Sequence, residues 1–249
     1  MKRLLATGLL LLLATAVAAG TLARTRHSES PVWMPAGVPV ARYHFDGAAL
    51  NDRSGLVDSS GKNHTLTPVL GHGATLRRVA HGTGQAVRFP PRCRRSPCPR
   101  LVLRAPSTPF LNPGNRAFRY GATVRLAPNR TSKGQNVLQK GFSTEGSQYK
   151  LQIDGRSGHP SCVLVAGPAI HLAIARVTVA DGRWHTLECR RDRTTLTVLI
   201  DNAVQGSTTV PATLTITNDR PLSIGGKSAF GNNDQFHGDL DDVWISLYG

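Results

Sequence analysis

The stretch Phe118-Arg119-Tyr120-Gly121-Ala122-Thr123-Val124-Arg125-Leu126 alternates between apolar and other side chains. Successive side chains of a β-strand point to opposite faces, so the apolar members share one face and Arg119 and Arg125 share the other. The stretch therefore predicts a strand that covers a hydrophobic core with one face and meets water or a second layer with the other.

The same alternation recurs at 149–153 and at 196–200. Turn sequences such as Asp154-Gly155 and Asp181-Gly182 lie beside such runs, where the backbone needs residues that tolerate positive φ. No segment has a convincing amphipathic helix pattern. The sequence predicts an all-β protein with two antiparallel sheets, in which residues 40–249 form one sandwich domain.

The N-terminus has the layout of a secretory signal peptide. Lys2 and Arg3 precede an apolar run without charge from Leu4 to Ala19, and Ala16-Val17-Ala18 offers a small-x-small cleavage site. We expect a signal peptide at 1–18, a linker at 19–39 and a secreted, extracellular protein. The alternative is an uncleaved anchor, but a bilayer span needs about 20 apolar residues. No later segment is long and apolar enough to cross a membrane.

The four cysteines are expected to form disulfides, because the chain is bound for an oxidising compartment. Three pairings are possible. Only four residues separate Cys93 from Cys98, so that loop closes most easily on itself, and Cys162 and Cys189 each lie in a β-patterned run. We predict the pairs Cys93–Cys98 and Cys162–Cys189. A zinc site is disfavoured because no paired C-x-x-C spacing is present.

Positive charge is concentrated in one part of the chain. The formal net charge is +15, and the segment from Ser59 to Thr144 holds 15 Lys and Arg but no Asp or Glu. Such asymmetry favours an anionic partner. An excess of 24 Arg over 6 Lys is also what a GC-rich genome produces, so composition alone is the competing explanation. Arg94, Arg95 and Arg100 surround the expected Cys93–Cys98 loop and are the candidate residues for an anionic ligand.

Six segments carry a resemblance in chain order. They are Ala41–Gly47, Asp58–His64 (DSSGKNH), Gly84–Phe89, Asp181–Thr186, Leu196–Asn202 and Phe236–Ile245. The ordered set resembles the laminin G-like and concanavalin A-like jelly-roll family over roughly residues 40–248. This resemblance implies a jelly-roll sandwich, with Trp184 as a core anchor of its strand. It says little about function, because this fold hosts lectins, glycanases, lyases and adhesion modules.

The resemblance also implies a calcium site where the first and last strands meet. Asp46 and Asp241 are the matching acidic positions, and calcium prefers carboxylate and carbonyl oxygens. Asp241 shares the period-two phase of Val243 and Ile245, which predicts that it points inward. The alternative is that Asp241 accepts backbone N–H groups or pairs with an arginine.

Catalytic motifs are missing from the sequence. A retaining glycanase needs two carboxylates about 5 to 5.5 Å apart, and the three glutamates, Glu29, Glu145 and Glu188, have no suitable spacing. No G-x-S-x-G elbow is present. A polysaccharide lyase or hydrolase remains the alternative function, with Tyr149 and His171 or His185 as conceivable lyase groups.

These observations predict a non-catalytic, secreted binding module for a glycan or another anionic envelope component. An acidic polysaccharide, a teichoic-acid-like polymer and an anionic membrane surface are the candidate partners. Nucleic acid is disfavoured by export, by the absence of a recognised motif and by only 14 aromatic residues.

Cleavage after Ala18 is directly testable. We expect the protein that is recovered from the medium of a secreting bacterial host to begin at Ala19, because the small-x-small pattern ends at Ala18. N-terminal sequencing and intact mass check this. Recovery of the full-length chain from the membrane fraction would instead support the uncleaved anchor.

Overall fold

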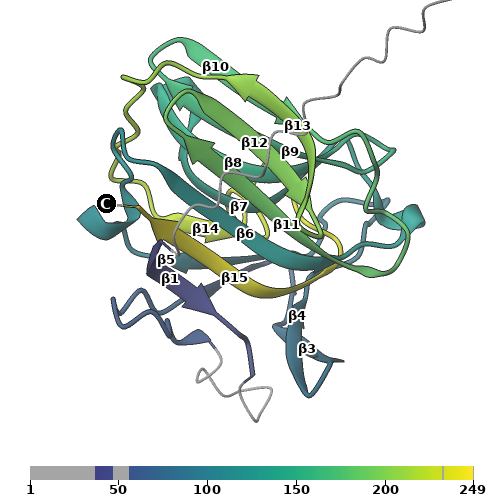
Figure 1. The fold of residues 1–249 in the computed structure, drawn as a ribbon. Coiled ribbons are helices and arrows are strands. Elements are labelled where there is room, and N and C mark those ends of the chain that lie inside the picture. Colours follow the sequence, from purple (N-terminus) through teal and green to yellow (C-terminus); the bar gives the residue numbers. More distant parts are fainter. Residues whose placement is uncertain (1–36, 47–55, 232, 249) are drawn as a thin grey trace, which may run out of the picture. The chain divides into compact units, whose positions relative to one another are not determined.

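The computed structural model describes residues 37–46, 56–231 and 233–248. They form two antiparallel β-sheets packed as a sandwich (Figure 1). The all-β, two-sheet fold predicted from the sequence is confirmed. The expected signal peptide lies outside the described residues, as does most of the expected linker. Within the described ranges, no helix has the length and apolar character that a membrane span requires.

Among the described residues, the first sheet has eight strands arranged around β15. In spatial order they are β13 (Ala203–Thr209), β12 (Thr195–Ile200), β11 (Trp184–Asp192), β6 (Phe118–Arg125), β15 (Asp239–Leu247), β4 (Gly84–Arg88) and β3 (Arg77–His81). The remaining strand, β1 (Val38–Tyr43), also pairs with β15. On one side β15 pairs with β6, and on the other it is shared between β4 and β1.

The second sheet has seven strands within the same described ranges. They are β10 (Ala169–Ile174), β9 (His159–Ala166), β8 (Ser147–Asp154), β7 (Gly134–Phe142), β14 (Leu222–Ile224), β5 (Arg100–Ala105) and β2 (Thr67–Gly71). Single helical turns connect some of the strands, namely η2 (Pro109–Leu111), η3 (Pro128–Arg130) and η4 (Ser143–Glu145).

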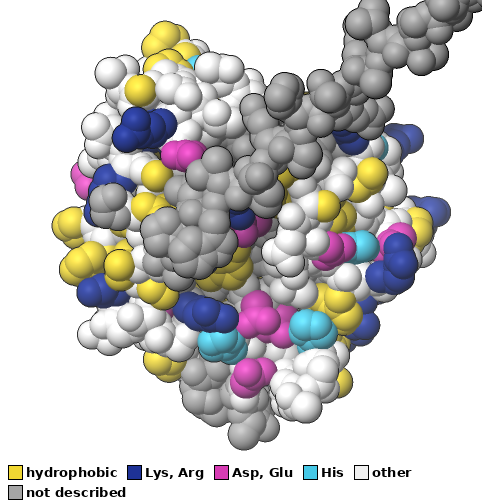
Figure 2. Space-filling model, viewed as in Figure 1, with side chains coloured by type: hydrophobic (Ala, Val, Ile, Leu, Met, Phe, Trp, Pro, Cys, Tyr) yellow, Lys and Arg dark blue, Asp and Glu magenta, His cyan; other side chains and the backbone are white. Residues whose placement is uncertain are grey.

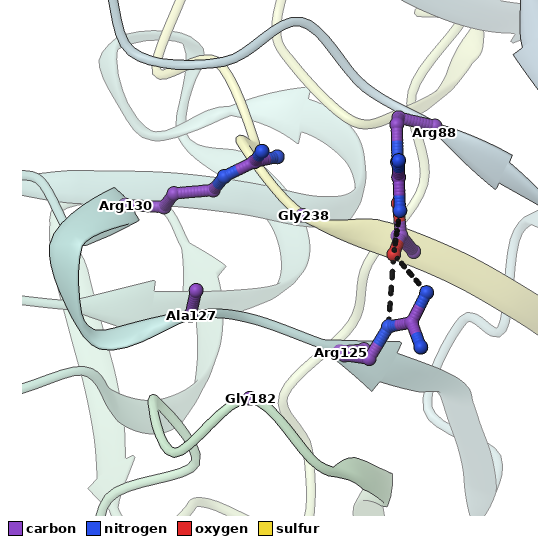
Figure 3. A pocket seen from close by; sticks show the side chains of 7 residues that line it. Arg88, Arg125, Ala127, Arg130, Gly182 and Gly238 are labelled. Atoms are coloured by element: carbon purple, nitrogen blue, oxygen red, sulfur yellow. Dashed lines mark hydrogen bonds and ion pairs between the residues drawn. The ribbon is translucent and has the colours of Figure 1, made fainter.

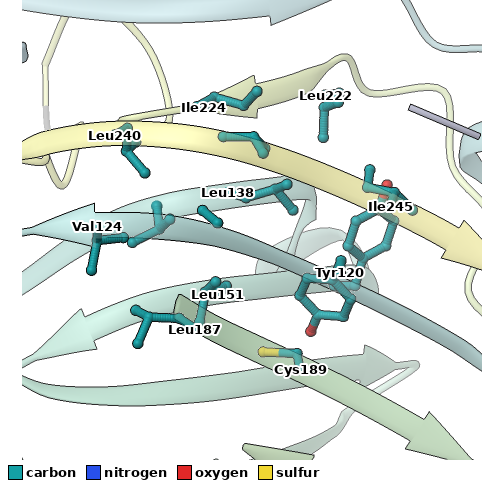
Figure 4. Packing of buried hydrophobic residues seen from close by; sticks show 14 of the residues in the cluster. Tyr120, Val124, Leu138, Leu151, Leu187, Cys189, Leu222, Ile224, Leu240 and Ile245 are labelled. Atoms are coloured by element: carbon teal, nitrogen blue, oxygen red, sulfur yellow. The ribbon is translucent and has the colours of Figure 1, made fainter. Parts of the chain in front are cut away.

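The alternating stretch at 118–126 behaves as its pattern predicts. The apolar side chains of β6, including Tyr120 and Val124, are fully buried, whereas Arg119 and Arg125 are half-buried on the outer face. Figure 4 shows Tyr120 and Val124 packed with Leu138 and Leu151 of the second sheet. The core therefore lies between the two inner faces, as in other aligned sandwiches.

Asp241 does not point into the core, contrary to the prediction from its phase. In the pairing of β15 with β6, Asp241 lies opposite Thr123, and Leu240 lies opposite Val124. Val124 and Leu240 are both fully buried, and directly opposed residues share one face of a sheet. Asp241 therefore projects from the outer face together with Thr123.

A β-bulge at Asp242 explains why the phase prediction was wrong. The pairing with β6 shifts register between Asp241 and Trp244, and Asp242 has a positive φ of 44°. A bulge adds one residue to a strand, so the alternation restarts beyond it. Val243 is therefore buried although Asp241 faces outward, and Trp244 lies on the outer face over Gly121.

The Asp58 turn holds β1 in place. The buried Asp58 carboxylate accepts N–H groups from Arg42 at 2.9 Å, Ser60 at 2.9 Å and His64 at 3.0 Å. Burial alone would raise the pKa of Asp58, but these hydrogen bonds outweigh it and hold that pKa below its usual value. The DSSGKNH segment is thus a closed turn organised around one carboxylate.

The structure joins the cysteines as the sequence predicted. Cys162 of β9 is bonded to Cys189 of β11, with Cα atoms 5.6 Å apart, so this bridge links the two sheets through the core. Cys93 is bonded to Cys98 in a surface loop, with Cα atoms 5.7 Å apart. One disulfide therefore staples the sandwich, and the other shapes a loop.

Removing the inter-sheet disulfide should destabilise the protein more than removing the loop disulfide. Cross-linking over about 26 residues contributes about 3 kcal/mol by loop entropy, and a four-residue loop contributes less. We expect this cost for Cys162→Ala with Cys189→Ala, measured by urea unfolding. An equal cost for Cys93→Ala with Cys98→Ala would contradict the expected division of roles.

Candidate anion-binding site

A row of four charged side chains and one tryptophan crosses the outer face of the first sheet. Directly opposed pairs link Arg77 of β3 to Arg88 of β4, Arg88 to Asp239 of β15, Asp239 to Arg125 of β6, and Arg125 to Trp184 of β11. We call these five residues the arginine row. The arginine row forms because these residues lie directly opposite one another on neighbouring strands, and their side chains all point to the outer face.

Asp239 is the acidic centre of the arginine row. Arg88 donates Nε–H to Oδ1 at 2.7 Å, and Arg125 donates Nη2–H to Oδ2 at 2.7 Å. The Asp239 side chain is buried, which would raise its pKa, but the two guanidinium groups outweigh burial and lower the pKa. Asp239 is therefore a carboxylate at neutral pH, and it joins β15 to both neighbouring strands.

A hollow of about 310 Å³ opens beside this ion pair. Its charged lining is Arg88, Arg125, Arg130 and Asp239, and we call it the arginine hollow. Figure 3 shows Arg130 on one side of the hollow, with Arg88 and Arg125 on the other. Gly238 is needed in its wall, because a Cβ there would come within 2.2 Å of the Arg125 carbonyl oxygen.

Positive charge exceeds negative charge at this site. Asp239 is the only acidic residue among the arginine row and the lining of the arginine hollow, whereas Arg77, Arg88, Arg125 and Arg130 are cationic. The Arg77 guanidinium donates to the Thr75 hydroxyl at 3.2 Å and has no carboxylate partner among the described residues. Like charges directly opposite each other in a sheet are destabilising. The Arg77–Arg88 pair is thus a place where an anion would relieve repulsion.

The pKa of His237 is also affected by the excess of positive charge near this site. Burial lowers its pKa, the Pro90 carbonyl 2.9 Å from Nδ1 acts in the opposite direction, and the positive charges of Arg92, Arg100 and Arg130 lower the pKa further. The positive charges of the two arginines that flank the Cys93–Cys98 loop and of Arg130 therefore act together on His237.

The arginines singled out from the sequence lie in two different situations. Arg94 and Arg95 are exposed on the Cys93–Cys98 loop. Arg100 is half-buried in β5 and donates to the side-chain oxygen of Asn233. The loop pair is free to attract an anion at long range, whereas Arg100 is engaged in holding the structure.

The sequence prediction missed the arginine hollow itself. The alternation at 118–126 predicted that Arg125 faces outward, but nothing in the sequence indicated that it shares Asp239 with Arg88. Arg130 follows β6 by one turn, η3, and period-two reasoning does not reach it. A usable signal is the contrast between the basic segment at 59–144 and the end of the chain, where four aspartates follow the last basic residue, Lys227.

Trp184 lies on the outer face, so its expected role as a core anchor is wrong. It is opposite Arg125, whose guanidinium lies 4.7 Å from the indole centroid. The His81 ring lies 4.0 Å from the same indole. Trp184 therefore holds Arg125 at the edge of the hollow through a cation–π contact.

The two acidic residues of the expected calcium site contact the hairpin formed by β3 and β4. Asp46 accepts the N–H of Gln85 at 2.9 Å. Asp241 Oδ2 lies 2.5 Å from His81 Nδ1, and Oδ1 accepts the N–H of Asp242 at 2.7 Å. Burial raises the pKa of Asp241, although these hydrogen bonds oppose the shift. Figure 2 shows acidic and histidine side chains gathered near β1, β15 and β3.

A calcium ion would need oxygen ligands beyond those of Asp46 and Asp241. Calcium takes six or more oxygen ligands, and both oxygens of Asp241 already accept hydrogen bonds. Within ranges 37–46, 56–231 and 233–248, no group of three or more His, Cys, Asp and Glu is arranged to hold a metal ion. Calcium binding through Asp46 and Asp241 stays a prediction.

The residues considered for a lyase are not displayed together. Tyr149 is fully buried in the core, where its hydroxyl donates to the Leu111 carbonyl at 3.2 Å. His185 is held between Asp201 at 2.7 Å and Asp181 at 3.1 Å. Tyr149 is thus not available to a ligand at the surface.

The strand order and the jelly-roll pairing define a concanavalin A-like sandwich. A sequence profile described as the "Concanavalin A-like lectin/glucanases superfamily" matches residues 110–248, which is more than half of the chain. The chain belongs to this superfamily. No curated protein sequence matches it detectably.

Solved structures agree on the fold. Domain 4 of AbnA, an extracellular arabinanase from Geobacillus stearothermophilus, has a TM-score of 0.60 at 16% identity, over 86% of this chain and 96% of that domain. The binding domain of Paraclostridial Mosquitocidal Protein 1 has a TM-score of 0.60 at 13% identity, over 85% of this chain and 49% of that one. The binding domain of Botulinum Neurotoxin DC scores 0.58 at 8% identity, over 84% and 48%. This chain thus spans about half the length of the toxin domains.

Replacing Asp239 should destabilise the protein in a pH-dependent way. Asp239→Asn leaves two arginines without their carboxylate, so we expect a loss of about 1 to 3 kcal/mol at pH 7. The folded-state pKa is below the unfolded value of about 3.9, so the stabilisation is complete above that value and lost as pH falls through the folded pKa. Urea unfolding of both proteins from pH 7 to pH 2 checks this.

Asp192→Asn is the matched control for this measurement. Asp192 is exposed and forms no ion pair among the described residues, so its replacement should change stability little at any pH. A wild-type advantage over Asp239→Asn that stayed constant down to pH 2 would contradict the assigned ion pair.

Proposed function

We propose that this chain is an exported, non-catalytic binding module that holds an acidic polysaccharide in the arginine hollow. The observation that carries the proposal is the hollow lined by Arg88, Arg125 and Arg130 with only Asp239 as counter-charge. Arginine keeps its charge at every physiological pH, so the surplus is permanent.

The hollow presents unused hydrogen-bond donors to an anion. Asp239 engages Nε and Nη2 of both Arg88 and Arg125, which leaves Nη1 of each without an acceptor among the described residues. Among the described residues, the Arg130 guanidinium makes a single hydrogen bond, to the His237 carbonyl at 3.3 Å. Guanidinium N–H groups match the geometry of carboxylate, sulfate and phosphate oxygens.

A sugar polymer is favoured over other anions by the fold. The AbnA domain was determined with arabinotriose, and the neurotoxin DC domain was determined with SialylT. An open, shallow hollow on a sheet suits a chain that passes across it. Export rests on the expected signal peptide, which lies outside the described residues.

The loop arginines serve attraction rather than docking. Arg94 and Arg95 are exposed and carry no hydrogen bond from their guanidinium groups in the described structure. Charges of this kind steer an anion toward a site, and salt screens them over about 8 Å at physiological ionic strength.

Arg130→Gln should weaken binding to an acidic polymer about tenfold, since one charge-assisted hydrogen bond is worth about 1.5 kcal/mol or more. Binding to polygalacturonate and to dextran sulfate is measured by calorimetry at 50 and 300 mM salt, with neutral dextran as the uncharged polymer. Arg94→Gln with Arg95→Gln should reduce binding mainly at the lower salt concentration.

Arg193→Gln is the matched control for this experiment. Arg193 is exposed in the turn after β11, at the opposite end of that strand from Trp184. It should bind like the wild type. Equal binding by Arg130→Gln and the wild type, or equal binding to neutral and acidic polymers, would contradict the proposed function.

A further inference from the structure

A second hollow adjoins the arginine hollow. Its volume is about 230 Å³, and Arg88 lines both. The other lining comes from the segment before β3, from Arg77 at the start of β3, and from Pro90, Pro91 and Pro99 on the two sides of the Cys93–Cys98 loop. We call it the proline hollow.

The proline hollow combines an apolar wall with two cations. Pro90, Pro91 and Pro99 supply flat, inflexible apolar surface, and Arg77 and Arg88 supply charge at the rim. Ligand sites commonly have this composition, in which apolar contacts provide area and a few polar groups fix orientation. A sugar ring has an apolar C–H face and a polar edge, so its two sides match these two kinds of lining.

The wall is held in place before any ligand binds. The Cys93–Cys98 disulfide closes the loop between Pro91 and Pro99. The Pro90 carbonyl accepts a hydrogen bond from His237 at 2.9 Å. Rigid surroundings reduce the entropy that binding would cost.

We propose that the two hollows are adjacent subsites of one extended site, which binds two successive sugars of an acidic polysaccharide. Arg88 lies between the subsites and contacts the anionic groups of both sugars. One sugar lies in the arginine hollow, and the next packs against the proline wall with Arg77 at its charged edge. This inference rests on the proposed function, and it adds the requirement for at least two acidic sugar units.

The unpaired Arg77 is explained by this arrangement. Arg77 and Arg88 are directly opposed like charges with no carboxylate between them, whereas Arg88 and Arg125 flank Asp239. Arg125 is paired with the carboxylate of Asp239. An anionic group of the ligand would be the corresponding partner of Arg77. Charge complementarity thus favours an acidic sugar in the proline hollow as well.

The test compares ligands of different length. Binding of galacturonic acid and of its dimer is measured by calorimetry at 50 mM salt, using the wild type, Thr75→Tyr and the control Thr194→Tyr. Thr75 is exposed and lines the proline hollow, so a tyrosine there fills the hollow. Thr194 is exposed in the turn after β11 and lines neither hollow, so the same change there leaves both hollows open.

We expect the wild type and Thr194→Tyr to bind the dimer at least tenfold more tightly than the monomer. Thr75→Tyr should bind the monomer like the wild type but gain less than threefold from the dimer. Dimer binding by Thr75→Tyr at the wild-type level would overturn the extended site, as would equal affinity of the wild type for monomer and dimer. In both cases the proposed function stands if Arg130→Gln still loses polymer binding. It fails together with the extended site if no acidic ligand binds the wild type.

Discussion

The outer face of this sandwich depends on the ion pair that Asp239 makes with Arg88 and Arg125. These residues stand on three adjacent strands, so one carboxylate joins β4, β15 and β6 at the point where β4 has only two opposed pairs with β15. A buried carboxylate is costly without partners, and here both oxygens are satisfied. The same pairing brings two arginines close together, which mutual repulsion would otherwise separate. Stability and an anion-attracting surface therefore arise from one contact.

The bulge at Asp242 lies where β15 changes its pairing partner from β4 to β1. Before the bulge β15 pairs with β4, and after it β15 pairs with β1. Because the alternation restarts there, Asp239 and Asp241 both face outward, while the strand still contributes Leu240 and Val243 to the core. Two carboxylates thus become available on the outer face. One meets the arginines, and the other meets His81 at 2.5 Å.

The sequence predicted most of the fold and little of the site, for identifiable physical reasons. The alternation of apolar side chains along 118–126 is enough to predict the strand β6 and its buried face. The short spacing of Cys93 and Cys98 favours the disulfide between them. The bulge at Asp242 could not be recognised from the sequence, because Asp242 is not a glycine. The prediction that Asp241 points into the core was therefore wrong. Arg77 lies opposite Arg88 because of the register between β3 and β4. Hydrophobic alternation predicts which face of its own strand a residue occupies, but it does not predict which residue of the neighbouring strand lies opposite. Site residues that come from five strands are therefore visible only in three dimensions.

Composition alone does not explain where the arginines lie. A GC-rich genome raises the number of arginines, and an arginine can then have a purely structural role. Arg191 is an example, because it is fully buried and donates to the carbonyls of Gly114 and Ala212. Here Arg88, Arg125 and Arg130 line one hollow, and Arg77 adjoins it without a counter-charge. Holding like charges together costs free energy, so their position in register beside a rigid apolar wall supports the proposed anionic ligand over codon usage.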